Sequence, residues 1–318
     1  MPTEMKRPVI VIGGPTASGK SATALDVAQE FDGVIINADS MQVYEALRIV
    51  TARPSVEDEK LVPHRLYGVM DASETCSAGY WEKLCIAEIE KAWAQGKLPV
   101  VTGGTGLYIK TLVDGISQLP PIPDDIRNTI RARGDAEGVE ALYAELQEKD
   151  SEMAARLKPR DRQRICRALE VLSATGKSLA QLQREIKPTP SLSAAYMTHV
   201  VMPERSILYE RCDQRFDLMI QAGAVEEVAA LEKRNLDAKL PIMKALGVPE
   251  LLRYVRGEVT LEEAKTLAQM QTRRFAKRQC TWFKNQINQC EIHHTQYSES
   301  LRDQIYKKIR QFLLTHTD

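Results

Sequence analysis

Short apolar runs alternate with stretches of helical periodicity in the first third of the chain. Residues 8–12, 33–38 and 98–102 are rich in apolar side chains, which is the pattern of strands buried on both faces of a parallel sheet. The segment 21–28 between the first two runs has the spacing of a helix. Because strand and helix keep alternating to about Gly115, we predict an α/β fold with a parallel sheet at its core.

The pattern changes after a proline-rich passage at residues 119–125. From 126 to 186 the apolar residues recur three and four positions apart, which predicts a helical insertion of about sixty residues. A second loop at 187–191 ends it. The expected division is a catalytic core of residues 1–117 and 190–318 and a helical insertion domain of residues 118–189.

The remainder of the chain is expected to rejoin the sheet and then continue as helices. Residues 196–202 read as a strand. Helices are predicted at 205–231, 249–254 and 261–288.

The loop between the first strand and the first helix carries the strongest chemical signal. Its sequence, GPTASGKS, has the Gly-x-x-x-x-Gly-Lys-Ser spacing of a P-loop and lies between the two elements that this motif requires. Backbone N–H groups of such a loop converge on phosphate oxygens, while Lys20 suits a terminal phosphate and the Ser21 hydroxyl suits Mg²⁺. The alternative is a glycine-rich turn without a ligand. The predicted diphosphate-binding residues are Gly14, Pro15, Thr16, Ala17, Ser18, Gly19, Lys20 and Ser21.

A nucleotide hydrolase usually has an aspartate at the tip of a second strand to hold Mg²⁺. Here the strand at 98–102 is followed by Gly-Gly-Thr-Gly at 103–106, without a carboxylate. The nearest acid at a strand end is Asp39. An aspartate in this position can hold a metal, act as a general base or cap a helix, and the residues alone leave these alternatives open.

Composition favours a soluble, cytoplasmic enzyme. The 43 Lys and Arg residues balance 43 Asp and Glu residues, so binding to a polyanion must come from clustered charge. No apolar run approaches the roughly 20 residues that cross a membrane, and the segment before Val9 is too short for a signal peptide. The six cysteines form no Cys-x-x-Cys pair, which argues against a zinc site and against a disulfide framework.

Two basic clusters stand out against the neutral background. Residues 156–167 contain six cations and one anion, and residues 272–284 interleave cations with aromatic side chains on an expected helix. Helical spacing places Arg274, Lys277 and Arg278 along one side of that helix. Such a face can bind phosphates and stack bases. The alternative for each cluster is a solvated helix face whose apolar residues pack in the core.

Seven motifs occur in an order that resembles one enzyme family. They are GPTASGKS at 14–21, DSMQVY at 39–44, TARPS at 51–55, PHRL at 63–66, GGTGLY at 103–108, QRICRALE at 163–170 and KRQCTWF at 277–283. From about Val9 to Phe283 the chain resembles the bacterial tRNA dimethylallyltransferases, also called tRNA isopentenyltransferases. It departs from them at Gly106, where many members carry Met, and at 246–248, where Leu-Gly-Val replaces Ile-Gly-Tyr.

The resemblance implies a P-loop NTPase-like core with a tRNA-binding helical insertion, and Mg²⁺ as cofactor. It implies transfer of a dimethylallyl group from dimethylallyl diphosphate to the exocyclic amine of the adenosine 3′-adjacent to the anticodon, with release of diphosphate. Asp39 would be the general base, Lys20 would stabilise the diphosphate, Thr105 would lie near the target nucleotide, and Ser21 would hold the metal. The residues expected to contact the anticodon stem–loop are Asp39, Ser40, Met41, Gln42, Thr105, Arg127, Gln163, Arg164, Ile165, Cys166 and Arg167.

Three other functions are compatible with a P-loop and are disfavoured by other residues of the chain. A small-molecule kinase would bind ATP at the P-loop, but the missing second metal carboxylate argues against it. An adenylate isopentenyltransferase would prenylate a free nucleotide, whereas the helix at 163–167 and the basic stripe at 273–284 favour RNA. An RNA-binding switch without chemistry would not need Asp39, Lys20 and Ser21 together. We therefore expect a monomeric enzyme whose partners are tRNA and dimethylallyl diphosphate, with no membrane association.

Overall fold

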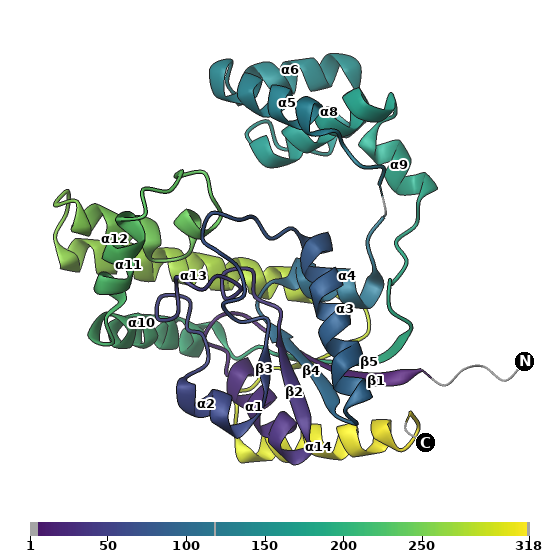
Figure 1. Ribbon diagram of the computed structural model, residues 1–318, viewed down its shortest axis with the longest axis vertical. Coiled ribbons are helices and arrows are strands. Elements are labelled where there is room, and N and C mark those ends of the chain that lie inside the picture. Colours follow the sequence, from purple (N-terminus) through teal and green to yellow (C-terminus); the bar gives the residue numbers. More distant parts are fainter. Residues whose placement is uncertain (1–5, 118, 317–318) are drawn as a thin grey trace, which may run out of the picture. The chain divides into compact units, whose positions relative to one another are not determined.

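A computed structural model describes residues 6–117 and 119–316. These residues fall into two compact units, each of which is described by itself (Figure 1). The first unit comprises the chain up to Val113 and from Ser191 onward, and the second comprises Asp114–Pro190. The insertion expected at 118–189 lies within the limits of the second unit.

The first unit is built on a parallel sheet of six strands in the order β3-β2-β4-β1-β5-β6, which confirms the predicted fold class. The strand β1 lies in the middle, with Gly13 opposite Gly103 of β4 and Val200 of β5. The strands are β1 (Arg7–Gly13), β2 (Gly33–Asn37), β3 (His64–Arg65), β4 (Leu98–Gly103), β5 (Ala194–Val201) and β6 (Cys290–His293).

Helices cover both faces of this sheet, and alternate side chains of β1 point to opposite faces. Ile10 and Ile12 pack in the cluster that includes α1 (Lys20–Glu30) and α14 (Glu299–Leu313). Val9 and Val11 pack in the larger cluster on the opposite face, with α3 (Ala78–Ala94) and α4 (Gly106–Asp114). The central strands are therefore apolar throughout their length, which is why they read as continuous apolar runs.

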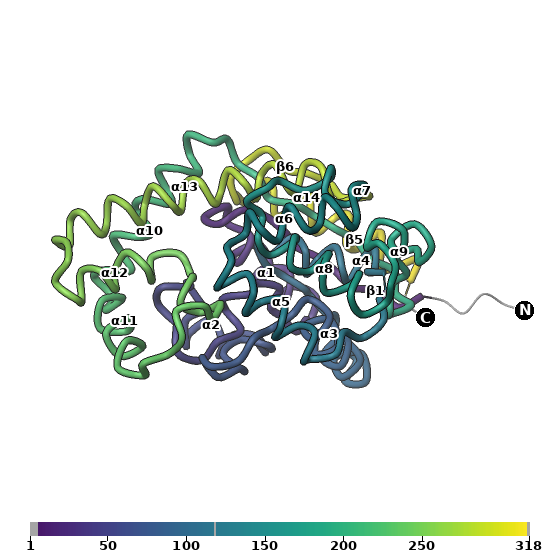
Figure 2. Tube along the Cα trace, turned by 90° about the horizontal axis from the view of Figure 1, so that it is seen from above, coloured from purple at the N-terminus to yellow at the C-terminus, as the bar shows by residue number. Residues whose placement is uncertain are grey.

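Further helices extend from the carboxyl end of β5. The α10 and α13 helices run side by side in two orthogonal views (Figures 1 and 2). The helices outside the insertion that have not yet been given are α2 (Val56–Leu61), α10 (Arg205–Gln221), α11 (Ala224–Glu232), a 3₁₀ turn (Ile242–Lys244), α12 (Val248–Val255) and α13 (Leu261–Gln286). Among the residues that the structure describes, no helix has both the length and the apolarity to span a bilayer.

The structure differs from the predicted elements in three places. The single helix expected at 205–231 is wrong, because Gly223 has φ 102° in the left-handed region and separates α10 from α11. The α13 helix begins at Leu261 as predicted, after a capping box between Thr260 and Glu263, but it ends at Gln286 rather than at 288. The strand β6 and the helix α14 were not predicted.

The second unit is helical, as the periodicity predicts, and has its own core. It consists of α5 (Asp124–Ala136), α6 (Val139–Lys149), α7 (Ser151–Ala155), α8 (Arg162–Thr175) and α9 (Leu179–Glu185). Leu142 and Leu146 of α6 pack in one buried cluster with Ile165 and Leu169 of α8. The two ends of the unit meet in an antiparallel bridge between Ile116 and Thr189.

Candidate active site

The P-loop follows β1 and turns tightly against the end of β5. A side chain at Gly14 is excluded, because its Cβ would lie 2.4 Å from the carbonyl oxygen of Val201. Gly19 has φ 97°, which places it in the left-handed region immediately before α1 begins at Lys20. The backbone N–H of Ser18 donates to the carbonyl oxygen of Pro15 at 3.3 Å and closes the turn. The loop thus has the strand, glycine turn and helix N-terminus that bind phosphate.

Two cationic side chains converge on this loop. The Nζ atom of Lys20 donates to the carbonyl oxygen of Pro15 at 3.2 Å, and Arg215 of α10 donates to the Thr16 hydroxyl. Burial lowers the pKa of Lys20 to about 8, although the charge of Asp39 opposes this shift. Burial also lowers the pKa of Arg215. A bound diphosphate would compensate both of these partly buried charges.

Asp39 lies just beyond β2 in a turn held by several hydrogen bonds. Its backbone N–H donates to Oδ1 of Asn37 at 2.8 Å, and the Asn37 amide donates to the carbonyl oxygens of Asp39 and Leu66, each at 3.0 Å. The Oδ1 atom of Asp39 accepts from the backbone N–H of Met41 at 2.9 Å. Asp39 therefore caps a turn and not a helix, since residues 40–55, all described, contain no helix.

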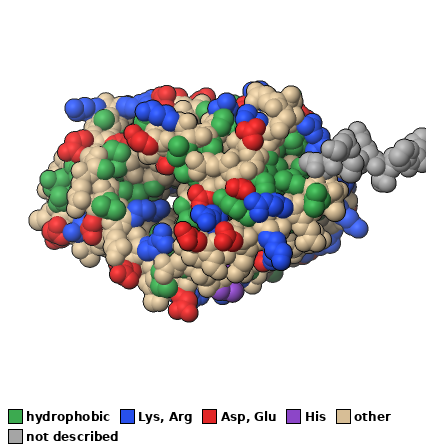
Figure 3. Space-filling view, turned by 90° about the horizontal axis from the view of Figure 1, so that it is seen from below, with side chains coloured by type: hydrophobic (Ala, Val, Ile, Leu, Met, Phe, Trp, Pro, Cys, Tyr) green, Lys and Arg blue, Asp and Glu red, His purple; other side chains and the backbone are tan. Residues whose placement is uncertain are grey.

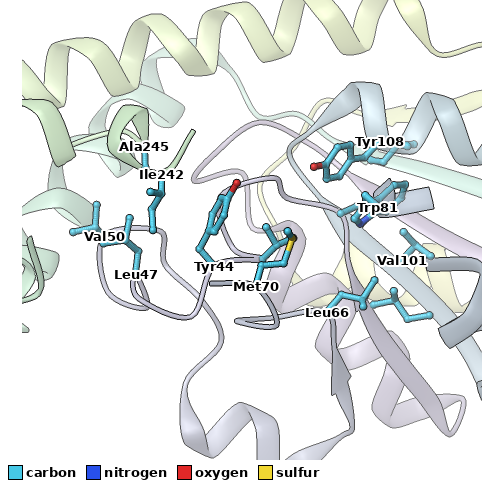
Figure 4. Close-up of a cluster of buried hydrophobic side chains, with 14 of the residues drawn as sticks. Tyr44, Leu47, Val50, Leu66, Met70, Trp81, Val101, Tyr108, Ile242 and Ala245 are labelled. Carbon is cyan, nitrogen blue, oxygen red and sulfur yellow. The ribbon is translucent and has the colours of Figure 1, made fainter. Parts of the chain in front are cut away.

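Two buried aromatic side chains hold the backbone that leads into this turn. The Trp81 Nε1–H donates to the carbonyl oxygen of Asn37 at 2.8 Å, and Tyr108 stacks on Trp81 with 4.5 Å between ring centroids (Figure 4). Both rings are almost fully buried. The backbone that positions Asp39 is thus anchored in the hydrophobic core.

The predicted catalytic residues come together at the carboxyl ends of the central strands. A Cβ placed on Gly104 would lie 3.4 Å from Oδ2 of Asp39 and 3.5 Å from the carbonyl oxygen of Gly14. The Thr105 hydroxyl accepts from the backbone N–H of Ser40 at 2.9 Å. This is the edge of an open α/β sheet at which ligands characteristically bind.

Gln279 of α13 joins two of these loops and was not among the predicted site residues. Its Oε1 atom accepts from the backbone N–H of Thr16 at 2.9 Å, and its Nε2 atom donates to the carbonyl oxygen of Gly104 at 2.8 Å. The side chain is buried. The KRQCTWF motif contained the residue, but its pattern alone indicated only that Gln279 lies away from the cationic side of the helix.

Arg215 was also missed, and no local motif marks it. It lies in the interior of α10, ten residues after the first residue of that helix, Arg205. The pairing of β5 with β1 brings α10 to the P-loop, and this pairing joins segments far apart in the chain. The contact between Arg215 and Thr16 therefore follows from the order of the strands and not from a local sequence pattern.

The remaining residues of the 39–42 segment make contacts within the protein. The Nε2 atom of Gln42 donates to the carbonyl oxygens of Thr51 and Ala52, each at 2.8 Å. Met41 is partly buried and packs against the larger hydrophobic core. Ser40 is bound to Thr105, as described above. The side-chain amide of Gln42 therefore shapes the loop that carries Asp39.

The residues predicted on α8 have different environments within the second unit. Gln163 and Arg164 are exposed, and Arg167 lies 3.6 Å from the buried carboxylate of Glu170. Ile165 and Cys166 are buried among the helices, at 0% and 6% exposure. Helical spacing turns these two side chains toward the core of the unit, so they offer no surface to RNA in this structure, and the expected contact of their positions with RNA stays a prediction.

Arg127, on α5, is tied to its own helix. It forms an ion pair with Asp124 at 2.6 Å and donates to the carbonyl oxygen of Ile122 at 3.3 Å. Its side chain is 36% exposed. A phosphate group would have to compete with Asp124 for this guanidinium.

The basic cluster on α13 is a cationic face, as predicted. Arg274, Lys277 and Arg278 are exposed, while Phe283 on the other side is buried. Arg273 is paired with Asp213 at 2.5 Å. Elsewhere the charges are mixed: on the face shown in Figure 3, Lys and Arg side chains are interspersed with Asp and Glu.

The fold and the site together define a P-loop α/β protein. The family model described as IPP transferase matches residues 42–286. The chain is 54% identical over 284 residues to the tRNA dimethylallyltransferase of Bradyrhizobium sp. (strain ORS 278), covering 89% of this chain and 92% of that protein. It is 51% identical over 281 residues to the tRNA dimethylallyltransferase of Rhodospirillum centenum, covering 88% and 90%.

Solved structures agree with these sequence relatives. The full-length tRNA isopentenylpyrophosphate transferase from Bacillus halodurans superposes with a TM-score of 0.69 at 30% identity, covering 96% of this chain and 97% of that one. A eukaryotic dimethylallyltransferase acting on tRNA gives a TM-score of 0.74 at 29% identity, covering 87% and 70%. The chain belongs to the IPP transferase family.

Proposed function

We propose that this protein transfers a dimethylallyl group from dimethylallyl diphosphate to the exocyclic amine of the adenosine 3′-adjacent to the anticodon of tRNA. Family membership supports transfer to tRNA. The observation that carries the chemistry is the position of the Asp39 carboxylate beside the P-loop, next to a β4 tip that has glycines in place of a metal-binding aspartate.

The P-loop side of the site is suited to a departing diphosphate. Negative charge builds on the diphosphate as its bond to the allylic carbon breaks, and preorganised donors stabilise that charge. Lys20, Arg215 and the N–H groups at the start of α1 are such donors. Because both side chains are partly withdrawn from water, their charges act more strongly than they would in solvent.

Asp39 is suited to accept the proton of the attacking amine. Its Oδ1 atom is held by the Met41 N–H, so the carboxylate has a fixed orientation, with Oδ2 toward Gly104. An aryl amine is a weak nucleophile until its proton is accepted by a base. Thr105 and Ser40, which are hydrogen-bonded to each other, lie in the loops next to Asp39.

The Ser21 side chain fits the expected Mg²⁺. Mg²⁺ binds to few protein oxygens, keeps several waters and takes its other ligands from substrate phosphates. The Ser21 hydroxyl is exposed in the first turn of α1, beside the phosphate loop, and offers one such oxygen. When bound there, the ion would neutralise part of the diphosphate charge.

Two exposed cationic surfaces are suited to tRNA. One consists of the exposed Arg164 with the neighbouring Gln163 and the partly exposed Arg167 on α8, and the other is Arg274, Lys277 and Arg278 on α13. Phosphate contacts of this kind supply much of the affinity of proteins for nucleic acid. We propose that the enzyme works as a cytoplasmic monomer on tRNA.

The test is mass spectrometry of nucleosides after incubation of the protein, Mg²⁺ and dimethylallyl diphosphate with unmodified tRNA, with AMP as a parallel acceptor. Prenylated adenosine from tRNA alone is expected. Product from AMP alone would favour an adenylate isopentenyltransferase. No product with either acceptor would refute the proposal and would favour a kinase that binds ATP at the P-loop.

The matched variant is Asp39→Asn, which keeps the oxygen that accepts from Met41 but removes the base. We expect transfer to fall by at least 10²-fold, the usual lower contribution of a general base, while tRNA binding stays largely intact because Asp39 is one of several expected contacts. Unchanged turnover would remove Asp39 as the base.

A further inference from the structure

A second cluster of chemistry-bearing side chains lies at the β6 edge of the sheet. His199 of β5 is opposite Glu291 of β6, and His293 is opposite Val201. Since paired residues of neighbouring strands point to the same face, His199, Glu291 and His293 share one face. That face also carries Val201 and is covered by α14, which supplies Lys308. None of these side chains takes part in the diphosphate site.

The three side chains converge on a small volume. The Nδ1 atom of His199 lies 3.0 Å from Nε2 of His293 and 3.7 Å from Oε2 of Glu291. One ligand atom from each residue lies within 4.8 Å of the other two. Ligands bound tetrahedrally to Zn²⁺ at about 2.0–2.1 Å are about 3.3 Å apart, so only small shifts are needed to place an ion among them.

Burial also suits a metal ion. His199 and His293 are 1% and 7% exposed, whereas the Glu291 side chain is 39% exposed and leaves a path from solvent. The cluster is therefore shielded by the protein on the histidine side and open on the carboxylate side.

Glu291 is held in position by a second residue. Lys308 of α14 donates to its Oε1 atom, while Oε2 faces His199. Hydrogen bonds of this kind commonly orient the carboxylate ligands of metals.

We propose that His199, Glu291 and His293 bind one divalent transition-metal ion, with Zn²⁺ the best match, and that this ion fastens β6 to β5. Two histidines and one glutamate are an established zinc-binding set, with water as the fourth ligand. The sequence expectation against a zinc site rested on the cysteine pattern and did not consider this set. The proposal is independent of the transferase function.

The position of the ion gives it a structural role near the P-loop. The carbonyl oxygen of His293 accepts from the backbone N–H of Met202 at 2.9 Å, and the chain then continues to Tyr297. A Cβ on Gly19 would lie 2.9 Å from the Cβ of Tyr297, so this segment touches the P-loop. An ion at the cluster would hold the start of that segment in place.

The test uses full-length protein without a histidine tag, stripped with a chelator and titrated with Co²⁺ as a spectroscopic substitute. We expect one equivalent to bind, with visible absorption typical of four-coordinate nitrogen and oxygen ligation, and Zn²⁺ to displace it. Added Zn²⁺ should raise the Tm of the stripped protein. Absence of saturable binding would overturn the proposal.

The variants locate the ion. His293→Asn should abolish the absorption, and Glu291→Gln should weaken binding by at least tenfold. His294→Ala, which changes the exposed neighbouring histidine, should bind as the wild type does. His199 is fully buried, so its replacement can unfold the protein. Glu291 is partly exposed, and Glu291→Gln therefore tests the metal site directly, provided that its circular dichroism shows an unchanged fold. Equal Co²⁺ binding by wild type and Glu291→Gln would overturn the assignment.

Discussion

The Oε1 atom of Gln279 accepts a hydrogen bond from the backbone N–H of Thr16 at 2.9 Å, between residues 263 positions apart in the sequence. The same amide donates to the carbonyl oxygen of Gly104. One buried side chain thus sets the spacing between the phosphate loop and the loop that approaches Asp39. The position of the leaving group relative to the base therefore depends on a residue that touches neither in this structure.

Gln279→Leu keeps the size of the side chain and removes both hydrogen bonds. The Thr16 N–H and the Gly104 carbonyl then lose their partner, and each such loss costs about 1–3 kcal/mol. We expect the free energy of unfolding to fall by about 2–6 kcal/mol and KM for dimethylallyl diphosphate to rise while tRNA affinity changes little. Denaturant titration and steady-state kinetics measure the two effects.

Gln286→Leu, at the exposed end of the same helix, is the control. If both variants have the same unfolding free energy, the bridge does not stabilise the site.

Lys20→Met should make the ligand-free protein more stable at pH 7. Burial lowers the pKa of Lys20 from its ordinary value of 10.5 to about 8. Below pH 8 the side chain is charged in the folded protein, and its burial then lowers the free energy of unfolding. Between pH 8 and 10.5 the unfolded chain binds more protons at this residue than the folded chain, and wild-type stability should gain a rising contribution with pH. Urea titrations across this range should show that contribution in the wild type and not in the variant.

Lys307→Met removes an exposed lysine of α14 and serves as the comparison. Inorganic diphosphate should raise the Tm of the wild type and of Lys307→Met but not of Lys20→Met. A Lys20→Met protein less stable than the wild type at pH 7 would contradict the argument.

Gly106 and Trp282 are predicted to be coupled by steric contact. A Cβ on Gly106 would lie 2.0 Å from the Trp282 ring, so any larger residue must displace the indole. Gly106→Met should lower the free energy of unfolding by about 1–3 kcal/mol through overpacking and should slow transfer. A double-mutant cycle with Trp282→Leu, which makes room for the methionine, measures the coupling.

The free energy of unfolding of the double variant should lie closer to that of Trp282→Leu than the sum of the two single changes predicts. Strict additivity would mean that the two side chains do not compete for this space.

Arg164→Ala and Lys277→Ala should each weaken tRNA binding in a salt-dependent manner. Both side chains are exposed, and removing one phosphate contact should flatten the slope of log affinity against log salt by about 0.7–0.9. Filter binding over a salt series measures the slope. Lys307→Ala is the matched control, and an unchanged slope in Arg164→Ala would exclude a phosphate contact by that residue.

Ile165→Ala should behave differently from its neighbour. Because Ile165 is 0% exposed, its truncation should lower the stability of the helical unit by about 2–5 kcal/mol. An effect on the salt slope without loss of stability would show that Ile165 faces the RNA in the complex.

Local sequence patterns were sufficient for the central strands, the P-loop and the helical nature of residues 126–186. Each of these has a short-range signal: β1 is apolar throughout because both of its faces are covered, and the P-loop has fixed spacing. The strand β6 is only four residues long and only His293 in it is buried, so it had no such signal. The break before α11 depended on a single glycine, Gly223.

The contacts of Arg215 and Gln279 could not be predicted for a different reason. Each lies in the middle of a helix that the periodicity predicted, yet its partner is in the P-loop. These contacts exist because β5 lies beside β1 and because α13 packs on α10. Local spacing does not encode pairings of that range.

The place of β1 between β4 and β5 has a consequence for synthesis on the ribosome. β1 and β4 can pair early in the nascent chain, but β5 begins only at Ala194, after the whole helical unit has been made. Until then β1 has one unpaired edge, and unpaired edges invite aggregation. The helical unit is continuous in sequence and has its own core, so it is able to fold before β5 pairs with β1. The phosphate loop is translated before β5 and before Gln279 of α13, which accepts from its Thr16 N–H, so its surroundings are completed only late in synthesis.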